Sequence, residues 1–199
     1  MYKRQVLSEE EIAVTIGKVD EVVEIELVNY FIKGNIALTK VDEDYPDNKL
    51  SGAVFEVYSD TNGDGKLDKD DTLLGEMKEL DGGVYQMSEL RYGKYLVKET
   101  KAPTGFVLDE NVYSVSVEEN GKTYTVENKA GVGFINAAQK GSLKIVKTSS
   151  DGKVEGFSFR VTGVDYDQTF KTDKNGEIVI EGLRIGDYTV SEVNDKASA

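Results

Sequence analysis

The 199-residue sequence predicts an all-β protein made of repeated domains. Apolar and polar residues alternate in short segments rich in β-branched and aromatic residues, as in AVFEVY at 53–58, which is typical of half-buried strands. The same series of segments occurs twice along the chain, which indicates a tandem arrangement. An acidic loop at 60–71 lies between strand-like segments, where a helical calcium sensor would have helices.

The internal repeat rests on three pairs of matching segments. They are 34–44 with 141–151, 50–59 with 154–163, and 83–100 with 176–193. Lys40 and Glu99 are 59 residues apart, whereas the matching Lys147 and Glu192 are 45 apart. The surplus is about the length of the acidic loop, so the loop is an insertion that the repeated unit does not need.

The repeat also predicts the domain organisation. VLSEEEIAVTI at 6–16 aligns with VLDENVYSVSV at 107–117, and IELVN at 25–29 aligns with GFIN at 133–136. We therefore expect three parts: the last strands of one domain at 1–33, a complete domain at 34–138, and the first part of a further domain at 139–199. Residues 1–5, MYKRQ, resemble the translated end of a transposon adaptor used in sequencing libraries, and we expect them to be foreign to the natural protein.

The acidic loop DTNGDGKLDKDD carries oxygen ligands at the spacing of a calcium-binding loop. The candidate ligands are Asp60, Asn62, Asp64, Lys66, Asp68 and Asp71, with Gly65 at the sharp turn. The alternative is a solvated acidic turn, because Asp, Asn and Gly are common in turns. If Ca²⁺ binds, we expect it to stabilise a hairpin and not to act as a switch, because no helix pair flanks the loop.

Composition excludes several classes of function. The formal net charge is −13, which argues against nucleic acid as a partner because phosphates are bound by Lys and Arg. The chain has no Cys and no His, which removes disulfides, thiol nucleophiles, Ser-His-Asp catalysis and typical zinc sites. Because no apolar run is long enough to span a bilayer, we expect no membrane contact from these residues.

Three polar residues are predicted to point inward with apolar neighbours, because residues two apart on a strand share a face. They are Lys40 beside Leu38, Glu99 beside Val97, and Asn136 beside Phe134. The incomplete copies repeat this pattern with Lys147, Glu192 and Asn29. The recurrence of the same three residue types at matched positions indicates a site.

Burial gives this trio a specific chemistry. Desolvation favours the neutral amine of Lys40 and the neutral acid of Glu99. A neutral amine is a nucleophile, and a protonated carboxyl group can polarise the Asn136 amide and transfer protons. We expect an amide bond between Lys40 and Asn136, loss of ammonia, and Glu99 as the catalytic acid and base. The alternatives are a buried salt bridge with a hydrogen-bonded Asn, and Asn128 as the reacting amide.

Several motifs resemble the Cna B-type, or SpaA-like, domains of Gram-positive surface proteins and pilins. The resemblance rests on TKVDED at 39–44, SGAVFEVY at 51–58, LVKETKAPTGF at 96–106 and GVGFIN at 131–136. It implies transthyretin-like or immunoglobulin-like β-sandwich repeats. It also implies an intramolecular isopeptide bond between Lys40 and Asn136, catalysed by Glu99.

The truncated copy departs from the family pattern because it has Lys147 and Glu192 but no Asn of its own. Asn29 serves either a preceding domain or the pair of Lys147 and Glu192. We expect residues 6–30 to pair with 141–193, within one chain or between chains, since an added strand satisfies an open sheet edge.

The predicted function is structural. We expect stalk or spacer repeats of a bacterial adhesin or pilin, outside the cell and anchored to the wall through parts beyond these residues. The expected partners are neighbouring repeats, with host extracellular matrix reached through other domains. The alternative is a ligand-binding adhesin module that recognises a matrix protein or glycan. An enzyme with turnover is not expected, because the trio faces its own core and reacts at most once.

Overall fold

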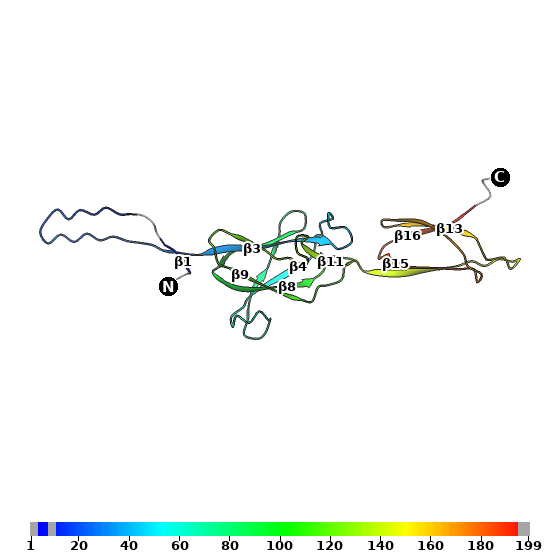
Figure 1. Ribbon diagram of the computed structural model, residues 1–199, viewed down its shortest axis with the longest axis horizontal. Helices are drawn as coiled ribbons and strands as arrows, with labels where there is room; N and C mark the ends of the chain where they lie inside the picture. The colour runs from blue at the N-terminus through cyan, green and yellow to red at the C-terminus, as the bar shows by residue number, and fades with distance from the viewer. Residues whose placement is uncertain (1–3, 8–10, 195–199) are drawn as a thin grey trace. The chain divides into compact units, whose positions relative to one another are not determined.

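The computed structural model describes residues 4–7 and 11–194 and confirms the all-β class. Strands are the only regular elements in the described ranges. Those ranges therefore contain no helix that could span a membrane. The chain divides into two compact units (Figure 1). Unit 1 contains the residues up to Thr104 and Leu108–Asn136, and unit 2 contains Gly105–Val107 and the residues from Ala137 onward.

The first sheet of unit 1 is built around its longest strand, β3. Its strands, in order, are β10 (Thr123–Thr125), β3 (Lys33–Asp42), β7 (Val84–Arg91) and β6 (Lys78–Glu79), and β11 (Phe134–Asn136) also pairs with β3. β7 runs antiparallel to β3, whereas β10 and β11 run parallel to it. The last strand of the unit, β11, therefore lies directly beside β3.

The second sheet of unit 1 is antiparallel. Its strands, in order, are β5 (Thr72–Glu76), β4 (Val54–Ser59), β8 (Gly93–Lys101) and β9 (Val112–Val117). The acidic loop at 60–71 joins β4 to β5, so it closes a hairpin at the edge of this sheet.

The core of unit 1 consists of the inward residues of both sheets. It includes Ile36, Leu38, Phe55, Val57, Tyr85, Tyr95, Val97, Val117 and Phe134. The ring of Phe55 meets those of Tyr85 and Phe134 edge to face, with centroids 5.1 and 4.9 Å apart. Phe134 of β11 is fully buried, which fixes the last strand against both sheets.

The segment before β3 forms a long hairpin, which we call the N-terminal hairpin (residues 5–7 and 11–31; Figure 1, dark blue). It is closed by β1 (Gln5–Val6) and β2 (Tyr30–Phe31), which pair antiparallel. Residues 11–29 carry no assigned strand, and their apolar side chains are exposed. The N-terminal hairpin therefore lacks a core of its own.

Unit 2 repeats part of this arrangement. One sheet pairs β12 (Lys140–Val146) with β15 (Glu177–Arg184), and the other has the order β14 (Tyr166–Lys171), β13 (Ser158–Gly163), β16 (Tyr188–Val193). A small core is formed by Val161, Ile178, Ile180 and Leu183. Among the described residues, β12 and β16 each have a single strand partner.

Candidate functional site

Lys40 lies on β3 among the core residues of unit 1. Ile36, Leu38 and Lys40 share the inward face because side chains alternate along a strand, and all three are at most 1% exposed. Lys40 Nζ lies over the ring of Phe134, 5.2 Å from the ring centroid. A lysine amine is therefore held in an apolar environment, where its charged form is costly.

Glu99 on β8 and Asn136 on β11 are buried beside Lys40, with exposures of 0% and 3%. Asn136 reaches this position because β11 lies close against β3. Gly133 permits that approach: its φ is +133°, and a Cβ there would lie 2.8 Å from the Thr39 carbonyl oxygen. Strands from both sheets thus bring the three side chains together.

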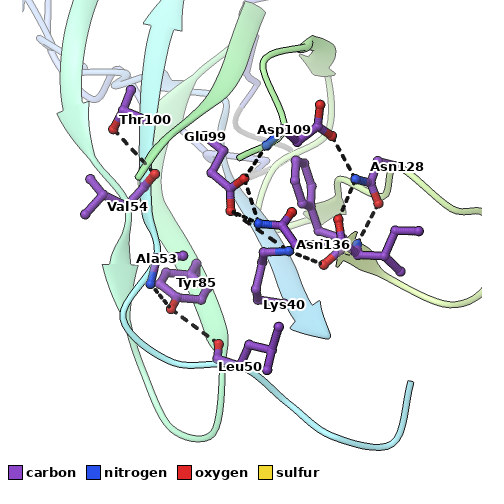
Figure 2. A network of polar contacts seen from close by, with 12 residues as sticks. Lys40, Leu50, Ala53, Val54, Tyr85, Glu99, Thr100, Asp109, Asn128 and Asn136 are labelled. Carbon is purple, nitrogen blue, oxygen red and sulfur yellow. Dashed lines mark hydrogen bonds and ion pairs between the residues drawn. The ribbon is translucent and has the colours of Figure 1, made fainter. Parts of the chain in front are cut away.

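The three side chains form one polar cluster (Figure 2). Asn136 Nδ2 donates to both carboxyl oxygens of Glu99 at 3.0 Å. Lys40 Nζ lies 3.9 Å from Glu99 Oε1 and donates to the Phe134 carbonyl oxygen at 3.0 Å. The main-chain N–H of Asp109 donates to Glu99 Oε2 at 2.8 Å. The carboxyl group of Glu99 thus contacts both the amide and the amine.

The carbonyl oxygen of Asn136 has no hydrogen-bond partner. It is the only buried side-chain oxygen or nitrogen without one in the part of the chain that the structure describes. An unsatisfied buried acceptor is costly, and most buried polar groups in folded proteins are hydrogen-bonded. Asn136 Oδ1 would gain a hydrogen-bond donor only if a neighbouring ionisable group changed its protonation state.

Burial shifts the pKa values of Lys40 and Glu99 in the directions that favour their neutral forms. It lowers the pKa of Lys40 from 10.5 to about 8, although the charges of Glu99, Asp109 and Asp42 act in the opposite direction. It also raises the pKa of Glu99, against the hydrogen bonds from Asp109 and Asn136. The cluster therefore holds a nucleophilic amine, an amide and a carboxyl group that can carry a proton.

Asn128, the competing amide, has a different environment. Its Oδ1 accepts from Ile135 N at 2.6 Å, and its Nδ2 donates to Ile135 O at 2.9 Å and to Asp109 Oδ2 at 2.8 Å. Burial raises the pKa of Asp109, but hydrogen bonds from Tyr113, Asn128 and Asn111 outweigh it and hold the pKa below its usual range. Asn128 thus holds β11 in place with a satisfied carbonyl group.

The matching residues of unit 2 form a simpler pair. Lys147 Nζ donates to both carboxyl oxygens of Glu192 at 3.1 and 3.0 Å. The two side chains are 21% and 45% exposed, and Lys147 lies over the ring of Phe157 at 4.8 Å. Glu192 reaches Lys147 but is more exposed than Glu99, because β16 is a sheet edge with no strand covering it on one side in the described residues.

Asn29 lies in the N-terminal hairpin and is exposed, as are Ile25 and Leu27 on the same face. The strand pairs of β12 to β16 are with one another. The pairing of residues 6–30 with 141–193, and of Asn29 with Lys147, therefore stays a prediction.

The acidic loop is organised by hydrogen bonds to its own main chain. Asp60 accepts from Gly63 and Gly65 at 2.7 and 3.1 Å, and Asp71 accepts from Thr61 and Asp68 at 3.1 and 2.9 Å. Asn62 accepts from Asp64 N, Asp64 accepts from Lys66 N, and Asn62 Nδ2 donates to Asp68.

The fit of this loop to Ca²⁺ is incomplete. Gly65 adopts φ +76°, which gives the sharp turn that such a loop needs. However, no group of three or more carboxylates among the described residues is arranged to hold a metal. Calcium binding would require side chains to turn from the main chain to the ion, and it stays a prediction.

The sequence analysis missed Asp109, whose main-chain N–H donates to Glu99. It named Asn128 only as a possible reacting amide, and not as the side chain that holds the main chain of Ile135. Both lie outside the alternating segments that located Lys40, Glu99 and Asn136. Nothing in a single sequence identifies which loop N–H group reaches a buried carboxylate.

The chain was compared with known proteins. Among solved structures, the Bacillus anthracis TIE protein is 27% identical with a TM-score of 0.64, over 83% of this chain and 29% of that one. A streptococcal ancillary pilin is 20% identical with a TM-score of 0.40, over 96% of this chain and 65% of that one. The shaft pilin SpaA of Lactobacillus rhamnosus GG is 17% identical with a TM-score of 0.41, over 81% and 88%.

The family is identified by a family model that matches the sequence of this chain. This chain spans less than a third of the TIE protein, and a search of curated protein sequences gives no match. The family model of SpaA, a prealbumin-like fold domain, matches residues 34–130 and again 141–197, which together make up most of the chain. The chain therefore belongs to the SpaA family of prealbumin-like fold domains.

Proposed function

We propose that the chain is a structural spacer of a bacterial surface protein or pilin, in which an isopeptide bond between Lys40 and Asn136 locks unit 1. One observation carries this proposal. A buried amine with a lowered pKa, an amide with an unpartnered carbonyl oxygen and a carboxyl group with a raised pKa occupy one cluster. The unpartnered oxygen of Asn136 supports a reacting amide, because most buried polar groups in folded proteins are hydrogen-bonded.

The reaction needs only groups of the cluster. The neutral amine of Lys40 attacks Cγ of Asn136, and the new C–N bond replaces the bond from Cγ to Nδ2. Protonated Glu99 donates to Oδ1 once the amide turns over, and then carries a proton from the amine to the leaving nitrogen. The products are one amide bond and one ammonia. Because the substrate is the protein itself, the reaction occurs once and gives no turnover.

The bond would join the first and last strands of the two-sheet sandwich of unit 1. Lys40 lies on β3 and Asn136 on the parallel strand β11. Tension between the two ends of the unit would pass through the side-chain bond and bypass the rest of the sandwich. Closing this 97-residue loop is worth about 5 kcal/mol in the chain-entropy treatment of a cross-link.

Location and partners follow from the same proposal. Membership of the SpaA family, together with relatives described as pilins, supports a position outside the cell on a Gram-positive surface. A side-chain amide needs no cysteine, and this chain has none. The proposal also includes anchoring to the wall, contact with neighbouring repeats and contact of other domains with host matrix.

Force spectroscopy on single molecules tests the spacer role. Pulled by its ends, the wild-type protein should show no extension from residues between Lys40 and Asn136. The Lys40→Ala variant should add a step of about 330 Å, the extended length of that loop. The Lys147→Ala variant is the matched control and should behave as wild type in unit 1. The same step in the wild-type protein would contradict the proposal.

A further inference from the structure

Asp109 lies in the connection between β8 and β9 and links two sides of the unit 1 cluster (Figure 2). Its main-chain N–H donates to Glu99 Oε2 at 2.8 Å. Its carboxylate accepts from Asn128 Nδ2 at 2.8 Å. Asn128 in turn holds both main-chain groups of Ile135, the residue before Asn136. A continuous series of hydrogen bonds therefore runs from the Glu99 carboxyl group to the strand that carries Asn136.

The carboxylate of Asp109 accepts two donors on each oxygen. Oδ1 accepts from the main-chain N–H of Asn111 at 3.0 Å and from Asn111 Nδ2 at 2.6 Å. Oδ2 accepts from the Tyr113 hydroxyl at 2.7 Å as well as from Asn128. The bond to the main chain two residues on is an Asx turn, which fixes the backbone around Asp109. The side chain of Asp109 thus holds the turn whose own N–H group reaches Glu99.

Tyr113 extends this network to the environment of Lys40. Burial and the hydrogen bond to Asp109 raise the pKa of Tyr113 to about 12, so its hydroxyl remains a donor at neutral pH. Its ring meets that of Phe134 edge to face, with centroids 5.1 Å apart. Lys40 Nζ lies over the same Phe134 ring and donates to the Phe134 carbonyl oxygen. Asp109 is therefore connected to the surroundings of all three side chains of the cluster.

The negative charge of Asp109 also acts on the ionisable pair. Its hydrogen bonds outweigh burial and hold its own pKa below the usual range, so the carboxylate is ionised. Burial raises the pKa of Glu99, and the Asp109 charge raises it further. Burial lowers the pKa of Lys40, and the charges of Glu99, Asp109 and Asp42 oppose that effect. An ionised Asp109 therefore helps the pair to keep its single proton as the pH rises.

The titratable groups that act on one another here come from three strands and one connection. They are Lys40 and Asp42 of β3, Glu99 of β8, Tyr113 of β9 and Asp109 itself. Asn128 and Asn136 are neutral, so they orient these groups without adding charge. The only cation in this set is the Lys40 amine, which is why a second carboxylate near Glu99 matters for the proton that the pair holds.

We propose that Asp109 is a positioning residue for the cross-linking reaction of unit 1, which holds the Glu99 carboxyl group and the Asn136 strand together and keeps a negative charge beside them. This inference rests on the proposed function. Asp109 acts through Glu99 and Asn128 and not on the reacting carbon. No proton passes through its carboxylate, because proton transfer from the amine to the leaving nitrogen belongs to Glu99.

Two substitutions separate the geometric from the electrostatic contribution. Asp109→Glu keeps the charge but lengthens the side chain, so the Asx turn and the contact with Asn128 are displaced. Asp109→Asn keeps the length and an oxygen for Tyr113 and Asn128 but removes the charge. Glu110→Gln is the matched control, because it removes one negative charge from the exposed neighbouring residue.

The experiment follows the loss of one ammonia by mass spectrometry while denatured chain is refolded at a series of pH values. Asp109→Glu should slow bond formation by about tenfold to a hundredfold, because small displacements of reacting groups are costly, and leave the pH profile in place. Asp109→Asn should move both limbs of the profile to lower pH, because loss of a negative charge lowers the pKa of both Glu99 and Lys40. Glu110→Gln should behave as wild type.

The fold is checked separately in a Lys40→Ala background, where no bond can form. Denaturant unfolding of Lys40→Ala with and without each Asp109 substitution shows whether the variant still folds under the conditions of the rate measurement. A purely structural role would slow bond formation in proportion to the loss of folded protein and would not move the pH profile. A shifted profile in a folded Asp109→Asn variant is therefore specific to the proposed role.

Other outcomes would overturn the proposal. Wild-type rates in both Asp109 variants, or slower bond formation in Asp109→Asn with the wild-type pH profile, would leave Asp109 as a residue that only stabilises the fold. Either result with a wild-type chain that lacks one ammonia would leave the proposed function intact. A wild-type chain that keeps its full mass at every pH would overturn the proposed function and this inference with it.

Discussion

The two units carry the same residue pair in two environments. In unit 1, Lys40 and Glu99 are 0% exposed and lie 3.9 Å apart, with Asn136 donating to the carboxyl group. In unit 2, Lys147 and Glu192 form a direct ion pair at 3.0 Å and are 21% and 45% exposed. The difference lies in the strands that cover them, β9 and β11. We propose that the lysine and glutamate become a reactive site only when these strands exclude water and supply the amide.

The largest expected effect separates the two lysines. Lys40→Ala removes the bond that closes the loop from Lys40 to Asn136, and we expect the free energy of unfolding of unit 1 to fall by about 5 kcal/mol. Lys147→Ala should leave unit 1 unchanged. Denaturant unfolding, followed by a tyrosine signal and by limited proteolysis, measures both. Equal stability of unit 1 in the two variants would show that Lys40 forms no stabilising bond.

The second prediction concerns the pH dependence of bond formation in unit 1. In the reactive state, Lys40 and Glu99 carry one titratable proton between them. It lies on the Glu99 carboxyl group, and the Lys40 amine is neutral. The rate should rise with pH up to the raised pKa of Glu99, level off, and fall about tenfold per unit above pH 8, where Lys40 and Glu99 have both lost their protons.

This profile can be measured on chain recovered from inclusion bodies in denaturant. The chain is refolded at a series of pH values, quenched at intervals and weighed by mass spectrometry. A rate that continues to rise well above pH 8 would show that protonated Glu99 is not required.

The third prediction concerns Asn128, which holds β11 through two hydrogen bonds to Ile135. Asn128→Ala leaves those main-chain groups without partners, and we expect a loss of about 2 kcal/mol in unfolding free energy before the bond has formed. Bond formation should slow but still reach completion, because Asn136 remains. If Asn128→Ala instead retained the full mass indefinitely, Asn128 would be the reacting amide.

Sequence alone predicts the part of this site that lies on regular strands. Alternation placed Lys40 with Leu38 and Glu99 with Val97, since the two faces of a strand differ in burial. Alternation gives the face of a strand but not whether another strand covers it, so it does not predict that the Glu192 side chain is 45% exposed. The main-chain N–H of Asp109 lies in a loop, where no periodicity applies.

A smaller effect is expected from calcium in the loop at 60–71. If the loop binds Ca²⁺ with the affinity of an extracellular module, millimolar Ca²⁺ should stabilise unit 1 by about 1 kcal/mol. Asp60→Ala should abolish the effect, and calorimetric titration measures it directly. Absence of heat and of any change in melting temperature would identify an acidic turn held only by hydrogen bonds to the main chain.

The smallest expected effect is on the ion pair of unit 2. Lys147→Ala should change the stability of unit 2 by less than about 1 kcal/mol when the protein is dilute, because exposed pairs are weak. A large loss in dilute protein would mean that unit 2 already resembles unit 1.

The intact mass of the purified protein under denaturing conditions tests the central claim most directly. The account predicts that the wild-type chain lacks one ammonia relative to its sequence, and that Lys40→Ala and Glu99→Ala each have their full calculated mass. A peptide that contains both Lys40 and Asn136 after digestion would locate the bond. A wild-type chain at its full mass would contradict the account and leave the buried cluster as a polar network without covalent chemistry.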